Sequence, residues 1–142
     1  MKLNSGVLFF LTAAWLFLLS TAAIAHHGTF VSYDSANPVT MKATVVEFHF
    51  TNPHIQLYFD VRDDKDNVTH WSAEGPDPAV LVAVGWGRKK TTTALSQGTE
   101  VTITVAPARN GKPVGTMSRV VLSNGDSVCG VGEGGREAAN CK

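Results

Sequence analysis

The sequence of 142 residues predicts an all-β domain, and two observations support this. From Met41 onward, short runs rich in β-branched and aromatic residues are separated by turn residues. Within the runs, apolar and polar residues alternate with the period of two that places them on opposite faces of a strand. With 44% hydrophobic and 17% charged residues, the composition is that of one small folded domain.

The first three predicted strands form a meander with bounds 41–50, 54–61 and 68–74. In the first, one face carries Thr44, Val46, Phe48 and Phe50, and the other carries Val45, Glu47 and His49. The second has the clearest alternation and should bury Ile55, Leu57, Phe59 and Val61. The polar run 63–67 is expected as the turn between the second and third strands.

A helix should follow the meander, since Asp77 is suited to an N-cap and Pro78 to the first helical position. The apolar run 79–84 forms this helix, and Gly85 ends it. A Thr-rich linker with the basic run 88–90 is expected as a solvated loop. Strands over 100–106 and 116–122 complete the element order. This order predicts a small five-stranded OB-like barrel with one short helix between strands 3 and 4; a small open sandwich is the alternative.

Four regions are expected along the chain. Residues 1–25 have the positive start, apolar stretch and small-residue site of a signal peptide cleaved after Ala25, with an uncleaved membrane anchor as the alternative. An N-terminal segment over 26–40, the barrel over 41–126 and a Gly-rich tail over 127–142 follow. We therefore expect a periplasmic or secreted protein that meets the membrane only through the first segment, if it is retained.

Two cysteines, Cys129 and Cys141, lie in the tail. An oxidising compartment favours a disulfide between them, worth about 3 kcal/mol for so short a loop in the chain-entropy model. A redox or metal-binding dithiol is the alternative, but the spacing lacks the two-residue gap of such motifs.

Charge and motif content argue against several functions. Twelve Lys and Arg residues balance twelve Asp and Glu residues, so the basic surface that binds nucleic acid is missing from the sequence. No motif for a covalent nucleophile or a phosphate-binding loop is recognisable either. These observations predict a protein that is not an enzyme.

The histidines are the one group of residues that suggests chemistry. If 51–53 connect the first two strands, residues whose numbers sum to about 103 face each other, which makes His49 and His54 neighbours on the outward face. Around the second turn the sum is about 130, which brings Glu74 towards His54 and places His70 apart, beside Asp60.

These positions predict a transition-metal site. Cleavage after Ala25 would expose His26, whose α-amine and ring can chelate one ion, with His27 beside it. We expect His26, His27, His49 and His54 as candidate ligands and Glu74 as a partner that orients a ligand. A nitrogen-rich site favours copper first and zinc second. The plainer alternative is that His54 caps a turn and the N-terminal pair belongs to a frayed end.

Motifs along nearly all of the mature chain resemble those of the domain-of-unknown-function family 6152. They are His26-His27, Tyr33-Asp34 with Pro38, Val45 to Phe50 running into Thr51-Asn52-Pro53-His54, Trp71 with Glu74, Gly85-Trp86, and Gly98 before a valine-rich strand. The resemblance implies a small exported bacterial protein and transfers no activity. The chain departs from the pattern at 96–99, where the family usually has a Pro-Gly-Asp turn, and in its cysteine tail.

Two functions follow from the sequence. One is an exported, non-enzymatic binding module that holds a metal ion or a small ligand at the first hairpin. The other is a periplasmic accessory or structural domain that binds another protein and holds no metal.

Overall fold

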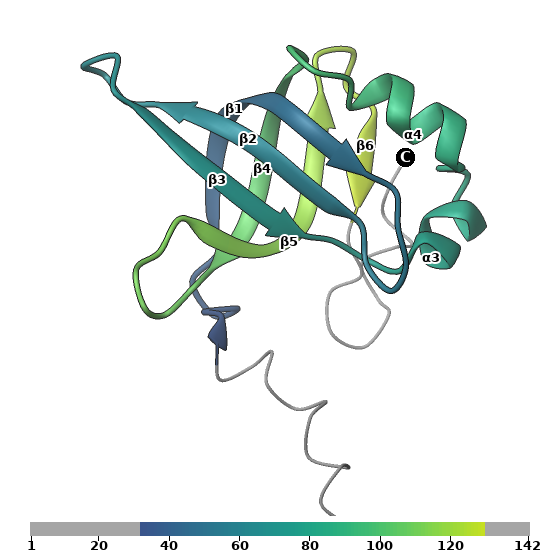
Figure 1. Ribbon diagram of the computed structural model, residues 1–142, viewed down its shortest axis with the longest axis horizontal. Helices are drawn as coiled ribbons and strands as arrows, with labels where there is room; N and C mark the ends of the chain where they lie inside the picture. Colours follow the sequence, from purple (N-terminus) through teal and green to yellow (C-terminus); the bar gives the residue numbers. More distant parts are fainter. Residues whose placement is uncertain (1–31, 130–142) are drawn as a thin grey trace, which may run out of the picture. The chain divides into compact units, whose positions relative to one another are not determined.

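Residues 32–129, the part of the chain that the computed structural model describes, form a closed five-stranded β-barrel with an additional strand and two short helices (Figure 1). The strands are β1 (Val39–His49), β2 (Gln56–Arg62), β3 (Val68–Glu74), β4 (Glu100–Pro107), β5 (Val114–Leu122) and β6 (Ser127–Cys129). Antiparallel pairing gives the order β3-β2-β1-β4-β5-β6. A three-residue parallel pairing between β3 and β5 closes the barrel. The predicted OB-like barrel is therefore confirmed.

The β2–β3 hairpin follows its sequence pattern. Ile55, which precedes β2, and Leu57 and Phe59 within it are each at most 1% exposed and belong to the barrel core. In the hairpin, Gln56 faces Glu74 and Asp60 faces His70, which confirms the predicted register.

β1 departs from its predicted alternation because it contains a bulge. The pairing with β2 shifts between Val45 and Glu47, so one extra residue stands on the β1 side. Val45 is consequently 1% exposed and Val46 is 39% exposed. The expectation that Val46 shares a face with Phe48 and Phe50 is wrong, since the bulge reverses the phase of the strand.

The connection between β1 and β2 is longer than expected. His49 faces Gln56, so the predicted direct pairing of His49 with His54 is wrong. Phe50 and Ile55 turn into the core at the two ends of the connection. Ile55 makes its backbone hydrogen bonds outside β1, donating to Pro76 O at 3.1 Å and accepting from Gly75 N at 2.9 Å.

The predicted helix is present as α3 (Pro78–Ala83). The Asp77 carboxylate accepts a hydrogen bond from Ala79 N at 2.6 Å, which confirms the expected N-cap. Leu81 is fully buried, whereas Val82 is 55% exposed. The side of the helix that carries Pro78 and Leu81 is buried and covers one end of the barrel.

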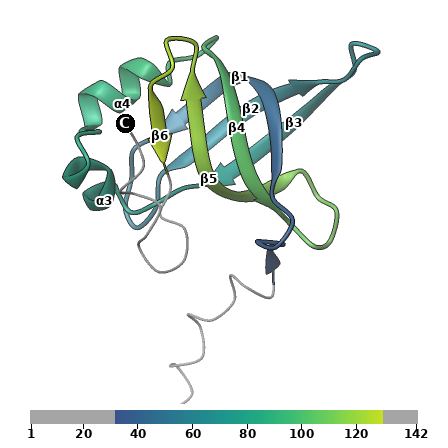
Figure 2. The same ribbon diagram turned by 180° about the vertical axis from the view of Figure 1, so that it is seen from behind.

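A second helix, α4 (Arg88–Ala94), replaces the expected loop, so the prediction of a single helix is wrong. The buried Thr91 hydroxyl shares its one hydrogen between Trp86 O and Gly87 O, each 3.0 Å away. Lys90 Nζ lies 4.0 Å from the centre of the Trp86 ring. These local contacts, together with the packing of Arg88 over the Phe50 ring at 4.9 Å, stabilise a segment with weak helix propensity. Both helices lie at the same end of the barrel, opposite the projecting β2–β3 hairpin (Figures 1 and 2).

The turn of this hairpin is organised by Asp63. Its carboxylate accepts hydrogen bonds from the Asn67 side chain at 2.8 Å and from the backbone N–H groups of Asn67 and Lys65 at 2.9 and 2.8 Å. The hydrogen bonds from the Asn67 side chain, the Asn67 backbone and the Lys65 backbone hold the pKa of Asp63 below its ordinary value.

Both ends of the described chain are joined to the sheet. Tyr33 forms a bridge with Ala108, and Asp34 Oδ1 lies 3.3 Å from Arg109 Nη2. At the other end, β6 pairs with β5 and buries Val128, so the sheet continues past residue 126. The predicted signal peptide over 1–25 and Cys141, the predicted disulfide partner of Cys129, lie outside the described residues. Within 32–129, no helix combines the length and apolar character needed to span a membrane.

Candidate functional site

Five polar side chains lie on β1, β2, β3 and the loop that joins β1 to β2. We call this group the histidine face; it consists of Glu47, His49, His54, Tyr58 and Glu74. The two histidines are linked through neighbouring strands. His49 faces Gln56 on β2, and Gln56 faces Glu74 on β3, which is the partner of His54. The group lies near the helical end of the barrel, because the loop over 50–55 is hydrogen-bonded to the residues that precede α3.

His49 is held by two neighbours within this group. Its Nε2 atom lies 2.8 Å from Glu47 Oε1. Its ring meets the Tyr58 ring edge-to-face, with centroids 5.8 Å apart. Glu47 and Tyr58 themselves face each other across β1 and β2, so the strand register brings all three side chains together.

His54 has a different carboxylate partner. Its Nε2 atom lies 3.4 Å from Glu74 Oε1, and both side chains are about half exposed. The predicted approach of Glu74 to His54 is therefore confirmed, although His54 lies in the loop and does not face His49. The predicted role of Glu74 in orienting a metal ligand stays a prediction.

The two pairs leave the same atom available on each imidazole. Nε2 is near a carboxylate in both, and within residues 32–129 no hydrogen bond to Nδ1 of His49 or His54 is present. A carboxylate on one ring nitrogen is the usual support of a histidine that binds metal through the other. The described part of the chain brings together no group of three His, Cys, Asp or Glu side chains able to hold an ion.

The other histidines are placed differently. His70 Nδ1 lies 2.6 Å from Asp60 Oδ1 in the β2–β3 hairpin, apart from the histidine face as expected. The candidate ligands His26 and His27 lie outside the described residues. His70 therefore provides a separate histidine–carboxylate pair, in which Nδ1 rather than Nε2 is near the carboxylate.

Sequence reasoning did not include Glu47 and Tyr58 in the candidate site. The signal for Tyr58 was available, because the alternation of β2 places it on the outward face with Gln56. Glu47 precedes His49 by two residues on the same strand, a spacing that puts both side chains on one face.

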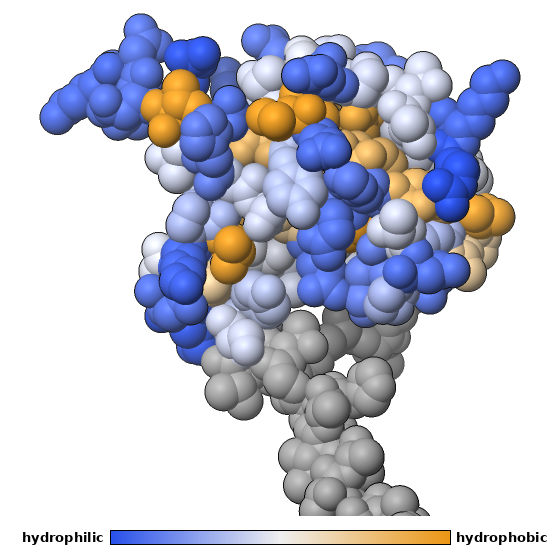
Figure 3. Space-filling model, viewed as in Figure 1, coloured by the Kyte–Doolittle hydropathy of each residue, from blue (hydrophilic) through white to orange (hydrophobic). Residues whose placement is uncertain are grey.

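The surface around these residues is mainly hydrophilic. Figure 3 shows separate apolar patches on the side of the barrel where β2 and β3 are nearest the viewer. The exposed large hydrophobic residues of the described chain are Val39, Val46, Tyr58, Val68 and Val82. Isolated apolar residues of this kind are normal on a protein surface.

The fold and this surface define a small OB-like β-barrel with a polar, histidine-bearing outer face. Residues 14–119 match the model of the family of unknown function DUF6152, and the chain belongs to that family. The match includes β1, β2 and β3 and therefore all five residues of the histidine face. Comparison with curated proteins and with solved structures finds no match.

Proposed function

We propose that this protein is an exported, non-enzymatic binding module that holds a transition metal ion at the histidine face. His49 and His54 supply two imidazoles through Nδ1, and His26 or His27 supplies the remaining nitrogen ligands. The observation that supports this proposal is the shared arrangement of the two rings, each with Nε2 near a carboxylate and Nδ1 available within residues 32–129. Export to the periplasm or the medium would expose His26 by cleavage after Ala25.

The donor set determines the metal. Imidazoles and an α-amine favour Cu(II), and Zn(II) is the second choice because divalent ions bind such sites in that order of affinity. Glu74 would hold the His54 ring in place without binding the ion, since its oxygen lies beside Nε2.

The length of chain before Ser32 limits how far His26 can lie from the start of the described residues. The Tyr33–Ala108 bridge and the hydrogen bond from Arg109 N to Ser32 O, of 2.9 Å, join the start of the described chain to the end of β4. Six residues, 26–31, precede Ser32. Fully extended, they reach about 20 Å, so the proposed site requires His26 to contact the histidine face within that span.

Calorimetric titration of Cu(II) into protein cleaved after Ala25 tests the proposal. We expect one site per chain at neutral pH, with affinity that falls on acidification because protons compete with the metal ion for the imidazole nitrogens. The double variant His26→Ala, His54→Ala should lose the site. His70→Ala is the matched control and should bind as the wild type does, because its Asp60 pair lies outside the histidine face. Unchanged affinity in the double variant would contradict the proposal.

The second candidate function is an accessory or structural domain that binds another exported protein and holds no metal. It is favoured by one observation: within residues 32–129 no three candidate ligands come together. Metal analysis of protein purified without an affinity tag separates the two functions. A stoichiometric metal supports the binding module, and a metal-free protein that also fails to take up Cu(II) supports the accessory domain.

A further inference from the structure

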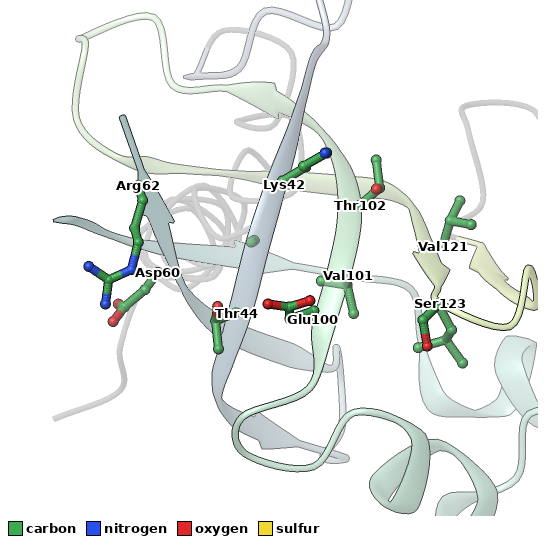
Figure 4. A pocket seen from close by; sticks show the side chains of 11 residues that line it. Lys42, Thr44, Asp60, Arg62, Glu100, Val101, Thr102, Val121 and Ser123 are labelled. Carbon is green, nitrogen blue, oxygen red and sulfur yellow. The ribbon is translucent and has the colours of Figure 1, made fainter. Parts of the chain in front are cut away.

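A polar hollow lies on the outer surface of the barrel where the β2–β3 hairpin separates from β1 (Figure 4). The pairing of β1 with β2 ends at Thr44 and Asp60. Before Thr44, β1 continues along β4, and after Asp60, β2 continues along β3. The resulting hollow has a volume of about 520 Å³ and lies across β1, β2, β4 and the end of β5.

Strand register arranges the charges of this hollow in two rows. In the first row, Thr44 faces Asp60 on one side and Glu100 on the other, so a hydroxyl lies between two carboxylates. The second row lies two residues away from the first along each strand, a distance of about 6.6 Å at a rise of about 3.3 Å per residue. It contains Lys42 on β1 and Arg62 on β2, and Figure 4 shows the Lys42 side chain directed towards Thr102 and the Arg62 side chain on the opposite side of β1, together with Asp60.

Three of these charges lack a protein partner among the described residues. No ion pair within 32–129 includes Lys42, Arg62 or Glu100. Asp60 has a partner in His70, which leaves its second oxygen available. None of the described residues that line the hollow is aromatic, so a ligand that requires ring stacking does not fit. The hollow instead offers donors and acceptors of both charges.

We propose that this hollow binds a small zwitterion of the α-amino-acid type. The ligand carboxylate would lie beside Lys42, and its ammonium group beside Glu100. A row spacing of about 6.6 Å matches a ligand whose charges are a few ångströms apart with a hydrogen bond at each end. A simple anion would leave Glu100 without a partner, and a simple cation would leave Lys42 without one. Only a ligand with both charges satisfies both rows.

Titration of the full mature protein followed by backbone amide NMR shifts tests this site. The probes are L-alanine, acetate and methylammonium. We expect saturable shifts at β1, β2 and β4 with L-alanine in the millimolar range, and no saturation with either singly charged ion. Lys42→Met and Glu100→Gln should each weaken binding by about tenfold or more, as for loss of one charge-assisted hydrogen bond. The control is Lys112→Met, an exposed lysine outside the hollow.

Three outcomes would overturn the proposal: no saturable shift with L-alanine, equal responses to all three probes, or unchanged affinity in both variants. Thermal melting checks that each variant is folded, and Lys42→Gln or Glu100→Ala, with the same expected loss, replaces a variant that is not. Cu(II) binding should be unaffected by Lys42→Met, because Lys42 lies outside the histidine face. Failure of this proposal is therefore distinguishable from failure of the proposed metal function.

Discussion

The bulge in β1 predicts that two adjacent valines contribute unequally to stability. Val45 is 1% exposed within the barrel core, whereas Val46 is 39% exposed at the bulge. In a regular strand with Phe48 and Phe50 facing inward, Val46 would be the buried residue and Val45 the exposed one. Truncation of each valine to alanine therefore tests where the strand changes phase.

The cost of Val45→Ala has two parts. Loss of about two methylene equivalents, at about 0.8 kcal/mol each, removes about 1.6 kcal/mol of transfer free energy. A residual cavity of about 40 Å³ adds about 1 kcal/mol, at about 24 cal/mol per Å³. The total is about 2.5 kcal/mol for Val45→Ala. Val46→Ala should cost about 0.5 kcal/mol, as surface substitutions do.

Urea denaturation of the wild type and the two variants measures this difference. With an m-value of about 1–1.5 kcal/mol per M, Val45→Ala should lower the midpoint by more than about 1 M, and Val46→Ala by less than half of that. The m-value should stay constant. Equal costs for the two variants, or a larger cost for Val46→Ala, would refute the bulge and restore the regular alternation.

Three further predictions concern the core, the hairpin turn and maturation. Leu57→Ala should destabilise the barrel by about 2–5 kcal/mol in the same denaturation assay, because Leu57 is fully buried. Because the pKa of Asp63 is lowered in the folded protein, its contribution to stability is present above the unfolded pKa and is lost as the pH falls below about 4. Asp63→Ala should therefore lose less stability on acidification than the wild type. Intact-mass analysis of exported protein should show a chain that begins at His26 and carries a Cys129–Cys141 bridge.

Each of these has a control or a contradicting result. Gln56→Ala, on the outward face beside Leu57, should be close to neutral, and a cost equal to that of Leu57→Ala would mean that β2 is inverted. An unchanged acid transition in Asp63→Ala would show that its hydrogen bonds do not contribute to stability. A mass that retains residues 1–25, or two thiols that alkylate without reduction, would contradict the maturation prediction.

Local patterns were sufficient to predict much of the barrel. Period-two alternation identified the buried face of β2, and the polar turn at Asp63 determined the register of β2 with β3. The contact between His54 and Glu74 follows from that register, since Glu74 faces Gln56, two residues after His54. The Asp77 cap similarly located α3, because an N-cap is a local interaction.

The remaining features depend on tertiary contacts. Nothing in the sequence around Val45 and Val46 marks the bulge, since both residues suit a regular strand. Ile55 resembles a strand residue but makes its hydrogen bonds with the segment before α3. α4 is rich in threonine, and it forms because Thr91 is buried and Arg88 packs over Phe50 at the end of β1. Its propensity alone predicts a loop.

The β3–β5 pairing that closes the barrel gives one residue an importance that its chemistry does not suggest. Gly115 faces Ala73 across the parallel pairing and Pro107 across the antiparallel one. A Cβ atom at this position would lie 2.6 Å from the carbonyl oxygen of Ala106, a contact that requires the backbone to move. Any side chain would separate β5 from β4 beside the closing pairs. Sequence variation in this protein is therefore restricted at Gly115 by backbone spacing, independently of any ligand.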